Sequence, residues 1–201
     1  PCLLSSRAAT LESTPPDNPT QIFISMFLIS AKLVIYLRSL TTLKMLTKDI
    51  HIRYQEYSSA DELIPEDREL VSAAIEAMSG AYAPYSHFHV GAAVRLSNGQ
   101  IVRGANQENA AFPSGLCAER TAMFAAGARY PDKDMLSIAV AGGVHGRLGT
   151  SPATPCGACR QVMAQYQAKS GKPMSVLMVA SDKILKFEKV DDILPMIFNC
   201  I

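Results

Sequence analysis

Two short cysteine clusters constrain the fold of this chain more than any other feature. The first is Cys117-Ala118-Glu119, and the second is Pro155-Cys156-Gly157-Ala158-Cys159. Each lies at the start of a predicted helix, where free N–H groups and the helix dipole favour thiolate over thiol. Three thiolates can fill three corners of a tetrahedral zinc site and leave the fourth open for water. We therefore expect two helix starts to meet, with Cys117, Cys156 and Cys159 binding one zinc ion.

A carboxylate and a guanidinium stand next to the first cysteine. Glu119 lies two residues after Cys117, where a proton carrier for the water would be needed. A His or Cys, one residue, a non-ligand Glu and a later P-C-x-x-C form the signature of zinc nucleobase deaminases. We expect Glu119 to be the catalytic residue. Arg120 could donate to a ligand sulfur and offset the net negative charge of a three-thiolate site, although an exposed helix arginine is the simpler interpretation.

Two other interpretations of the cysteines stay open at this point. A closed structural zinc site needs a fourth ligand, and His87, His89 and His145 are nearby candidates that do not stand at the usual spacing. Cys156-Gly157-Ala158-Cys159 alone also fits a thioredoxin-type redox motif. That second interpretation leaves Cys117-Ala118-Glu119 unexplained.

The amino-acid composition limits which binding partners and which cellular compartment we expect for the protein. Nineteen Lys and Arg against 18 Asp and Glu give a net charge of +1, and Trp is absent. A polyanion-binding surface normally shows a basic excess, so we expect no nucleic-acid partner. Five cysteines suit a reducing compartment better than a secreted disulfide scaffold, because the odd count leaves one thiol over. We expect a cytoplasmic protein.

The first 55 residues differ from the rest. Residues 22–37 are strongly apolar, but the run is short for a spanning helix and carries Lys32, so we expect no stable membrane association. Residues 1–55 are predicted to be an N-terminal extension outside the core fold, and 56–201 to be the functional domain. Met45 is the expected natural start. Cys2 and Cys200, near the ends, have no expected role in the site.

The remaining pattern predicts alternating helices and strands. Apolar residues recur at helical spacing over 66–78, with Pro65 ahead and Gly80 as a stop. Asn98-Gly99 is a hairpin signal between two strands. The predicted helices are 66–78, 117–127 and 157–168, with a short terminal one at 190–194; the predicted strands are 89–96, 100–104, 136–141, 175–180 and 184–187. This order predicts an α/β fold, with one mixed sheet covered by helices on its faces.

Several ordered motifs carry a family resemblance over about residues 68–198. They are Pro84-Tyr85-Ser86-His87-Phe88-His89-Val90-Gly91-Ala92-Ala93, Asn106-Gln107-Glu108-Asn109-Ala110, Ser114-Gly115-Leu116-Cys117-Ala118-Glu119-Arg120 and Pro155-Cys156-Gly157-Ala158-Cys159-Arg160-Gln161. The chain resembles the small cytidine deaminases of pyrimidine salvage. The resemblance implies a three-layer α/β/α sandwich with one mixed five-stranded sheet, and a homotetramer with shared active sites.

The resemblance also implies roles around a small nucleoside. Asn106 and Glu108 would hydrogen-bond the ribose, Phe88 would pack against the pyrimidine, and the Ala118 N–H would meet the base carbonyl. Phe198 would reach a neighbouring active site. The residues themselves leave simpler alternatives, a strand-end turn for Asn106 and Glu108 and a core position for Phe88.

The leading hypothesis is hydrolytic deamination of cytidine and deoxycytidine to uridine and deoxyuridine with release of ammonia. A blasticidin-type antibiotic deaminase shares the motifs. A polynucleotide-editing deaminase usually has His as first ligand and needs basic channel residues. A zinc-stabilised interaction module would tolerate Glu119→Gln.

The loop 142–149 lacks the Lys and Ser/Thr of a phosphate-binding motif and is expected to be a surface connection.

Overall fold

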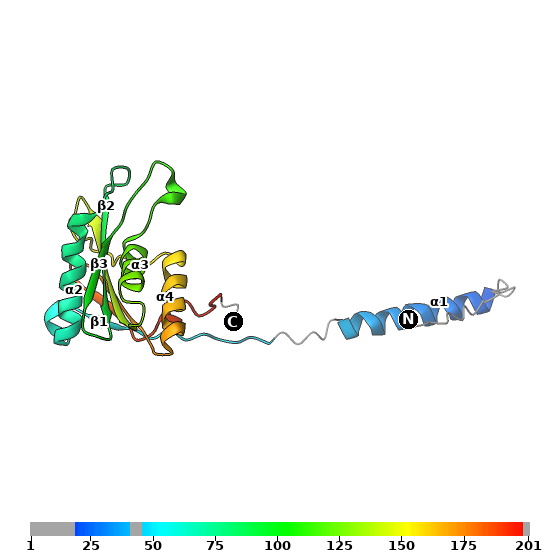
Figure 1. Cartoon of the computed structure of the whole chain (residues 1–201). Coiled ribbons are helices and arrows are strands. Elements are labelled where there is room, and N and C mark those ends of the chain that lie inside the picture. The colour runs from blue at the N-terminus through cyan, green and yellow to red at the C-terminus, as the bar shows by residue number, and fades with distance from the viewer. Residues whose placement is uncertain (1–18, 41–45, 199–201) are drawn as a thin grey trace, which may run out of the picture. The chain divides into compact units, whose positions relative to one another are not determined.

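A computed structural model describes residues 19–40 and 46–198 (Figure 1). The chain divides into two compact units between Asp49 and Ile50. The first contains α1 (Pro19–Leu40), which exposes large apolar side chains such as Phe23 and Phe27. In the described part of the chain, no helix has the length and apolar content to cross a bilayer. Met45, Cys2 and Cys200 lie outside the described residues, and the division at residue 55 stays a prediction.

The second unit is built on one mixed sheet of six strands in the order β1-β6-β5-β4-β2-β3. Neighbouring strands are antiparallel except β4 and β5, which run parallel. The strands are β1 (Gln55–Tyr57), β2 (Phe88–Leu96), β3 (Ile101–Ala105), β4 (Met135–Val144), β5 (Ser175–Val179) and β6 (Ile184–Phe187). The predicted count of five is therefore wrong by one. The missed strand, β1, adds three residues to the edge at β6, too few to show an alternating pattern.

Helices cover both faces of this sheet (Figure 1), which confirms the predicted three-layer architecture. One core lies between the sheet and α2 (Pro65–Ala77). The other lies between the sheet, α3 (Ala118–Arg129) and α4 (Gly157–Ser170). Four 3₁₀ turns complete the described elements of this unit: η1 (Ala60–Glu62), η2 (Met78–Gly80), η3 (Phe112–Ser114) and η4 (Val190–Asp192).

Strand alternation divides side chains between the two cores. In β2, Ala92, Val94 and Leu96 belong to the core under α3 and α4, and Ala93 belongs to the core under α2. In β3, Gly104 lets α3 approach closely, since a Cβ there would overlap the backbone of Ala118 and Ala122. The glycine in β3 thus allows the start of α3, which carries the first cysteine cluster, to lie close to the sheet.

The elements begin and end near the predicted residues, with one informative exception. Gly99, in the predicted hairpin turn, has φ 82°, a conformation that glycine adopts without strain. Strand β4, in contrast, continues past the predicted end at residue 141. Gly142 and Gly143 pair with Val90 and His89 of β2, so the first part of the expected 142–149 surface loop is strand.

Candidate active site and metal centre

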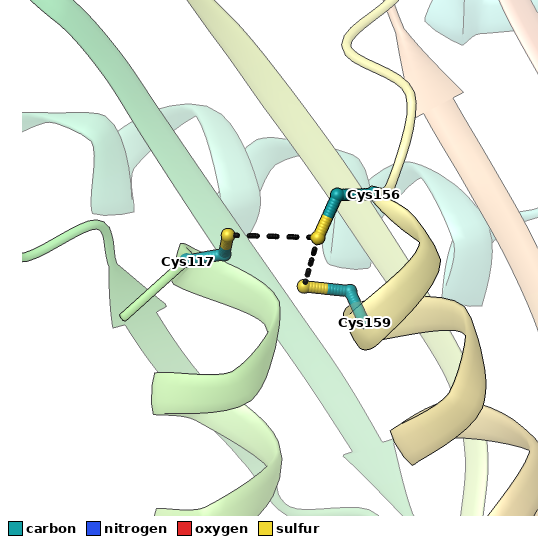
Figure 2. A group of neighbouring side chains, drawn as sticks. All are labelled: Cys117, Cys156 and Cys159. Atoms are coloured by element: carbon teal, nitrogen blue, oxygen red, sulfur yellow. Dashed lines mark hydrogen bonds between the residues drawn. The ribbon is translucent and has the colours of Figure 1, made fainter. Parts of the chain in front are cut away.

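The three cysteines converge where α3 and α4 begin. Cys117 is the N-cap of α3, Cys156 is the N-cap of α4, and Cys159 lies in the first turn of α4. Figure 2 shows their sulfurs pointing toward one another, with 3.9 Å between those of Cys117 and Cys156 and 3.5 Å between those of Cys156 and Cys159. Zn–S bonds of about 2.3 Å at tetrahedral angles place sulfurs roughly 3.8 Å apart. The three thiols therefore fit a zinc ion.

The electrostatics of the cluster favour a negative ligand set. A hydrogen bond from the Cys159 thiol, helped by the Arg120 guanidinium, lowers the pKa of Cys117 to about 5. The same hydrogen bond to Cys117, followed by burial, raises the pKa of Cys159. In the metal-free protein the cluster thus holds a thiolate on Cys117 and keeps the Cys159 proton until a metal displaces it.

Arg120 lies where a charge-balancing group is expected. Its guanidinium nitrogen is 4.0 Å from the Cys117 sulfur, a contact within one turn of α3. Its Nε is buried and has no hydrogen-bond partner among the described residues. The contact supports the interpretation of Arg120 as a cation beside a ligand sulfur.

Glu119 is a buried carboxyl group at the second position of α3, with an exposed fraction of 4%. Burial raises its pKa, and the negative charge of Cys117 acts in the same direction. A carboxyl with a raised pKa holds a proton more readily near neutral pH, as a group that both accepts and donates protons requires.

A cavity of about 690 Å³ brings the predicted residues together. Its lining includes six side chains predicted from the sequence together with Ala118: Phe88, Asn106, Glu108, Cys117, Ala118, Glu119 and Cys156. Cys159 is fully buried behind it. An adjoining cavity of about 570 Å³ shares Asn106, Glu108 and Cys117, and is also lined by Arg120.

The apolar wall of this cavity is the ring of Phe88 on β2. Its exposed fraction is 40%, so the ring is not a core residue. A Cβ on Gly142 would lie 3.2 Å from the ring carbon Cε1, which places the ring over a glycine of β4. Ala118, at the N-terminus of α3, is fully buried. One apolar face and one helix N-terminus thus border the same space.

Asn106 makes a structural contact that the sequence did not reveal. Its Oδ1 accepts from Val90 N at 2.8 Å, and its Nδ2 donates to Phe88 O at 2.9 Å. The side chain thus holds the start of β2. An amide has a second N–H and a second lone pair, so Asn106 can still bind one ligand group.

The carboxylate of Glu108 is held by backbone hydrogen bonds to one of its two oxygens. Its Oε2 accepts from the backbone N–H groups of Tyr85 at 3.0 Å and Ser86 at 3.2 Å. Hydrogen bonds from the Ser86 hydroxyl and the Tyr85 N–H lower the pKa of the carboxyl. Glu108 is therefore an ionised acceptor at neutral pH, beside the same cavity as Asn106.

Phe198 does not join this group within one chain. It lies 73% exposed beside α4, and its backbone pairs with the side chain of Gln161. The sequence also missed one wall of the cavity, residues 149–154. The sequence could have indicated this wall, because the loop that connects β4 to the second cysteine cluster must run past the metal site.

Comparison with known proteins agrees with this geometry. The family model described as the cytidine and deoxycytidylate deaminase zinc-binding region matches residues 64–172, more than half of the chain. The chain belongs to the cytidine and deoxycytidylate deaminase family. The matched residues contain Glu119 and all three clustered cysteines, so the group that fits zinc lies in the zinc-binding region of a family member.

Individual family members show how far the likeness extends. A cytidine deaminase of Halalkalibacterium halodurans is 48% identical over 102 residues, 49% of this chain and 71% of that protein. One of Mycobacterium tuberculosis is 35% identical over 126 residues, 63% of this chain and 84% of that protein. The crystal structure of cytidine deaminase from Burkholderia pseudomallei aligns with TM-score 0.54 and 41% identity, covering 65% of this chain and 97% of that one. The likeness therefore spans between 71% and 97% of these family members.

Proposed function

We propose that this chain hydrolyses the exocyclic amine of cytidine and deoxycytidine, giving uridine or deoxyuridine and ammonia. One observation carries the proposal. Two cysteines of the three-thiol group that fits zinc, together with the buried Glu119, line the same cavity as Phe88, Asn106 and Glu108. The relatives named cytidine deaminase support the choice of base.

The reaction needs a nucleophile and a proton carrier. Zinc held by Cys117, Cys156 and Cys159 would lower the pKa of water at its open position toward about 7. As the water oxygen bonds to C4 of the pyrimidine, the Glu119 carboxylate would accept one water proton and pass it to N3. It would then pass the remaining proton of that oxygen to the amine, which leaves as ammonia when the C4–N bond breaks. Its burial keeps bulk water away from these transfers. One carboxyl that alternates between base and acid meets both needs.

The remaining residues hold the nucleoside. The Phe88 ring packs against the pyrimidine, and the Ala118 N–H, at a helix N-terminus, donates to the base carbonyl oxygen. Glu108 accepts from a ribose hydroxyl through its carboxylate, and Asn106 donates its second N–H to the sugar. Arg120 offsets part of the charge of the thiolates.

The charge of the cavity favours a nucleoside over a nucleotide. Its described lining residues include no Lys or Arg, while Glu108 and Glu119 are both carboxyl residues. The adjoining cavity has Arg120, but that guanidinium lies against Cys117. A phosphate would therefore enter beside an ionised Glu108, and no Lys or Arg in the described lining of the two cavities is free to bind it.

We also propose that the protein acts in cytoplasmic pyrimidine salvage as a homotetramer. Free thiols at Cys117, Cys156 and Cys159 suit a reducing compartment. Tyr85 and Phe112 line the adjoining cavity and expose 51% and 74% of their surfaces. Their rings meet edge to face, with 5.8 Å between the ring centroids. A second copy would cover these rings, and Phe198 is exposed for contact with such a copy.

The test is ultraviolet-monitored turnover by the full chain with its zinc content measured. Cytidine, deoxycytidine, deoxycytidylate and a cytosine-bearing antibiotic would be compared side by side. We expect both nucleosides to be converted, and the nucleotide to react at least about tenfold more slowly. Zinc-loaded protein that spares the nucleosides and deaminates another compound would contradict the substrate assignment.

A further inference from the structure

The loop that delivers the first thiol of the second cluster packs Ala153 against the core but makes few hydrogen bonds. Residues 150–155 belong to no helix or strand. Within the described chain they make one hydrogen bond, in which Arg160 Nε donates to Pro155 O at 2.8 Å. Cys156 follows directly and is exposed. Among the described residues, the one hydrogen bond that fixes the backbone just before Cys156 is therefore the one to Pro155.

Arg160 holds a second segment with the same guanidinium. Its NH1 donates to Ile193 O at 2.9 Å, just after η4. Ile193 is 6% exposed and lies in the same core cluster as Cys159. The Arg160 backbone N–H also donates to Cys156 O at 3.0 Å. One residue thus ties the chain before Cys156, the first turn of α4 and a core-packed carboxyl-terminal segment together.

We propose that Arg160 is a positioning residue for the zinc centre, which sets the Cys156 sulfur relative to Cys159 by bridging Pro155 and Ile193. It touches no sulfur in the described hydrogen bonds and acts through backbone. The planar guanidinium reaches two carbonyls with fixed geometry, which a lysine ammonium cannot reproduce. Pro155 is buried, so its carbonyl would lose its partner without water to replace it fully.

The neighbouring Gln161 provides a matched control. Its Nε2 donates to Phe198 O at 2.7 Å, and its Oε1 accepts from Phe198 N at 3.2 Å. It therefore anchors the carboxyl-terminal segment from the same helical turn but makes no hydrogen bond to the 150–155 loop. A variant of Gln161 disturbs the segment and leaves the support of Cys156 in place.

The experiment measures zinc affinity of the full chain by competition with a chromophoric chelator, for the wild type and for Arg160→Gln, Arg160→Lys and Gln161→Ala. Groups that orient metal ligands typically change affinity about 10- to 100-fold. We expect Arg160→Gln to weaken zinc binding at least about tenfold and Arg160→Lys by a smaller factor. Gln161→Ala should stay within about twofold. Cobalt-substituted Arg160 variants should show shifted sulfur-to-cobalt absorption bands.

Wild-type zinc affinity and cobalt spectra in both Arg160 variants would overturn the proposal. So would an equal loss in Gln161→Ala. If Arg160→Gln does not fold, Arg160→Lys decides alone by the same two readouts. The inference rests on the proposed three-cysteine zinc site, and a wild-type chain that binds no zinc would overturn both. A zinc-binding chain without cytidine turnover would contradict the substrate assignment alone.

Discussion

At the scale of single residues, backbone groups hold the carboxylate of Glu108 in place in the ligand-free chain. Backbone N–H groups of Tyr85 and Ser86 both bind Oε2. The lowered pKa keeps the group ionised at neutral pH, so the carboxylate is a charged acceptor that lines the cavity.

Glu108→Gln is expected to raise KM for cytidine more than it lowers kcat. Loss of a charged acceptor corresponds to roughly a ten- to hundredfold drop in kcat/KM. Steady-state kinetics with equal zinc content measure it, with Glu76→Gln as control because Glu76 pairs with Arg103 on the surface. Unchanged KM in Glu108→Gln would remove Glu108 from the sugar site.

Cys117 provides a pH-dependent prediction for the metal-free chain. Its folded pKa of about 5 lies below the ordinary value of 9.0, so the thiolate adds stability above pH 9 that is lost as pH falls through 5. We expect iodoacetamide to alkylate Cys117 at pH 6–7 much faster than an ordinary thiol. Mass spectrometry of chelator-treated protein measures this, and Arg120→Gln should slow it. A reaction midpoint near pH 9 would disagree with the geometry of the cluster.

At the scale of elements, the site depends on how α3 and α4 meet the sheet. Cys117 and Cys156 are both N-caps that make no side-chain capping hydrogen bond. Each helix start thus leaves its cysteine sulfur free for the metal. The distance between the two helix starts is set by how the helices pack on the sheet. One such contact is that of α3 with Gly104 of β3.

Gly104→Ala should therefore damage the site from a distance. The added Cβ overlaps α3 backbone and cannot be relieved by a side-chain rotation, so overpacking of this kind costs about 1–3 kcal/mol or more. Denaturant unfolding and zinc titration measure the effect. Gly157→Ala is the control, because a Cβ there meets no atom within 4 Å. Equal stability of the two variants would show that α3 is not held by this contact.

Much of this arrangement was predictable from the sequence, for identifiable reasons. The cysteines and Glu119 carry a spacing that only a few chemistries use, so their convergence could be predicted. The sixth strand could not, because β1 has three residues and is stabilised by its pairing with β6. The Asn106 bridge to Phe88 and Val90 and the Arg160 bridge to Pro155 and Ile193 are long-range contacts to backbone. Backbone partners leave no pattern in the sequence.

At the scale of the whole molecule, one chain leaves two large aromatic rings exposed to solvent. Phe112 is 74% exposed and Phe198 is 73% exposed. Light scattering should give about four times the chain mass of 21.7 kDa. Phe112→Glu should lower both the mass and the deaminase activity, because a charge at a buried interface opposes association. A fully active protein with the mass of one chain would contradict the proposed tetramer.

The central claim is that Glu119 carries protons beside zinc held by three cysteines. It is tested most directly by cytidine turnover of the wild type and Glu119→Gln, each with one zinc per chain. Gln keeps the shape of the side chain but carries no titratable proton. Positioned proton transfer contributes about 10²–10⁴-fold. The variant should therefore bind zinc normally and lose at least about 10²-fold in kcat. Wild-type turnover by zinc-loaded Glu119→Gln would contradict the account.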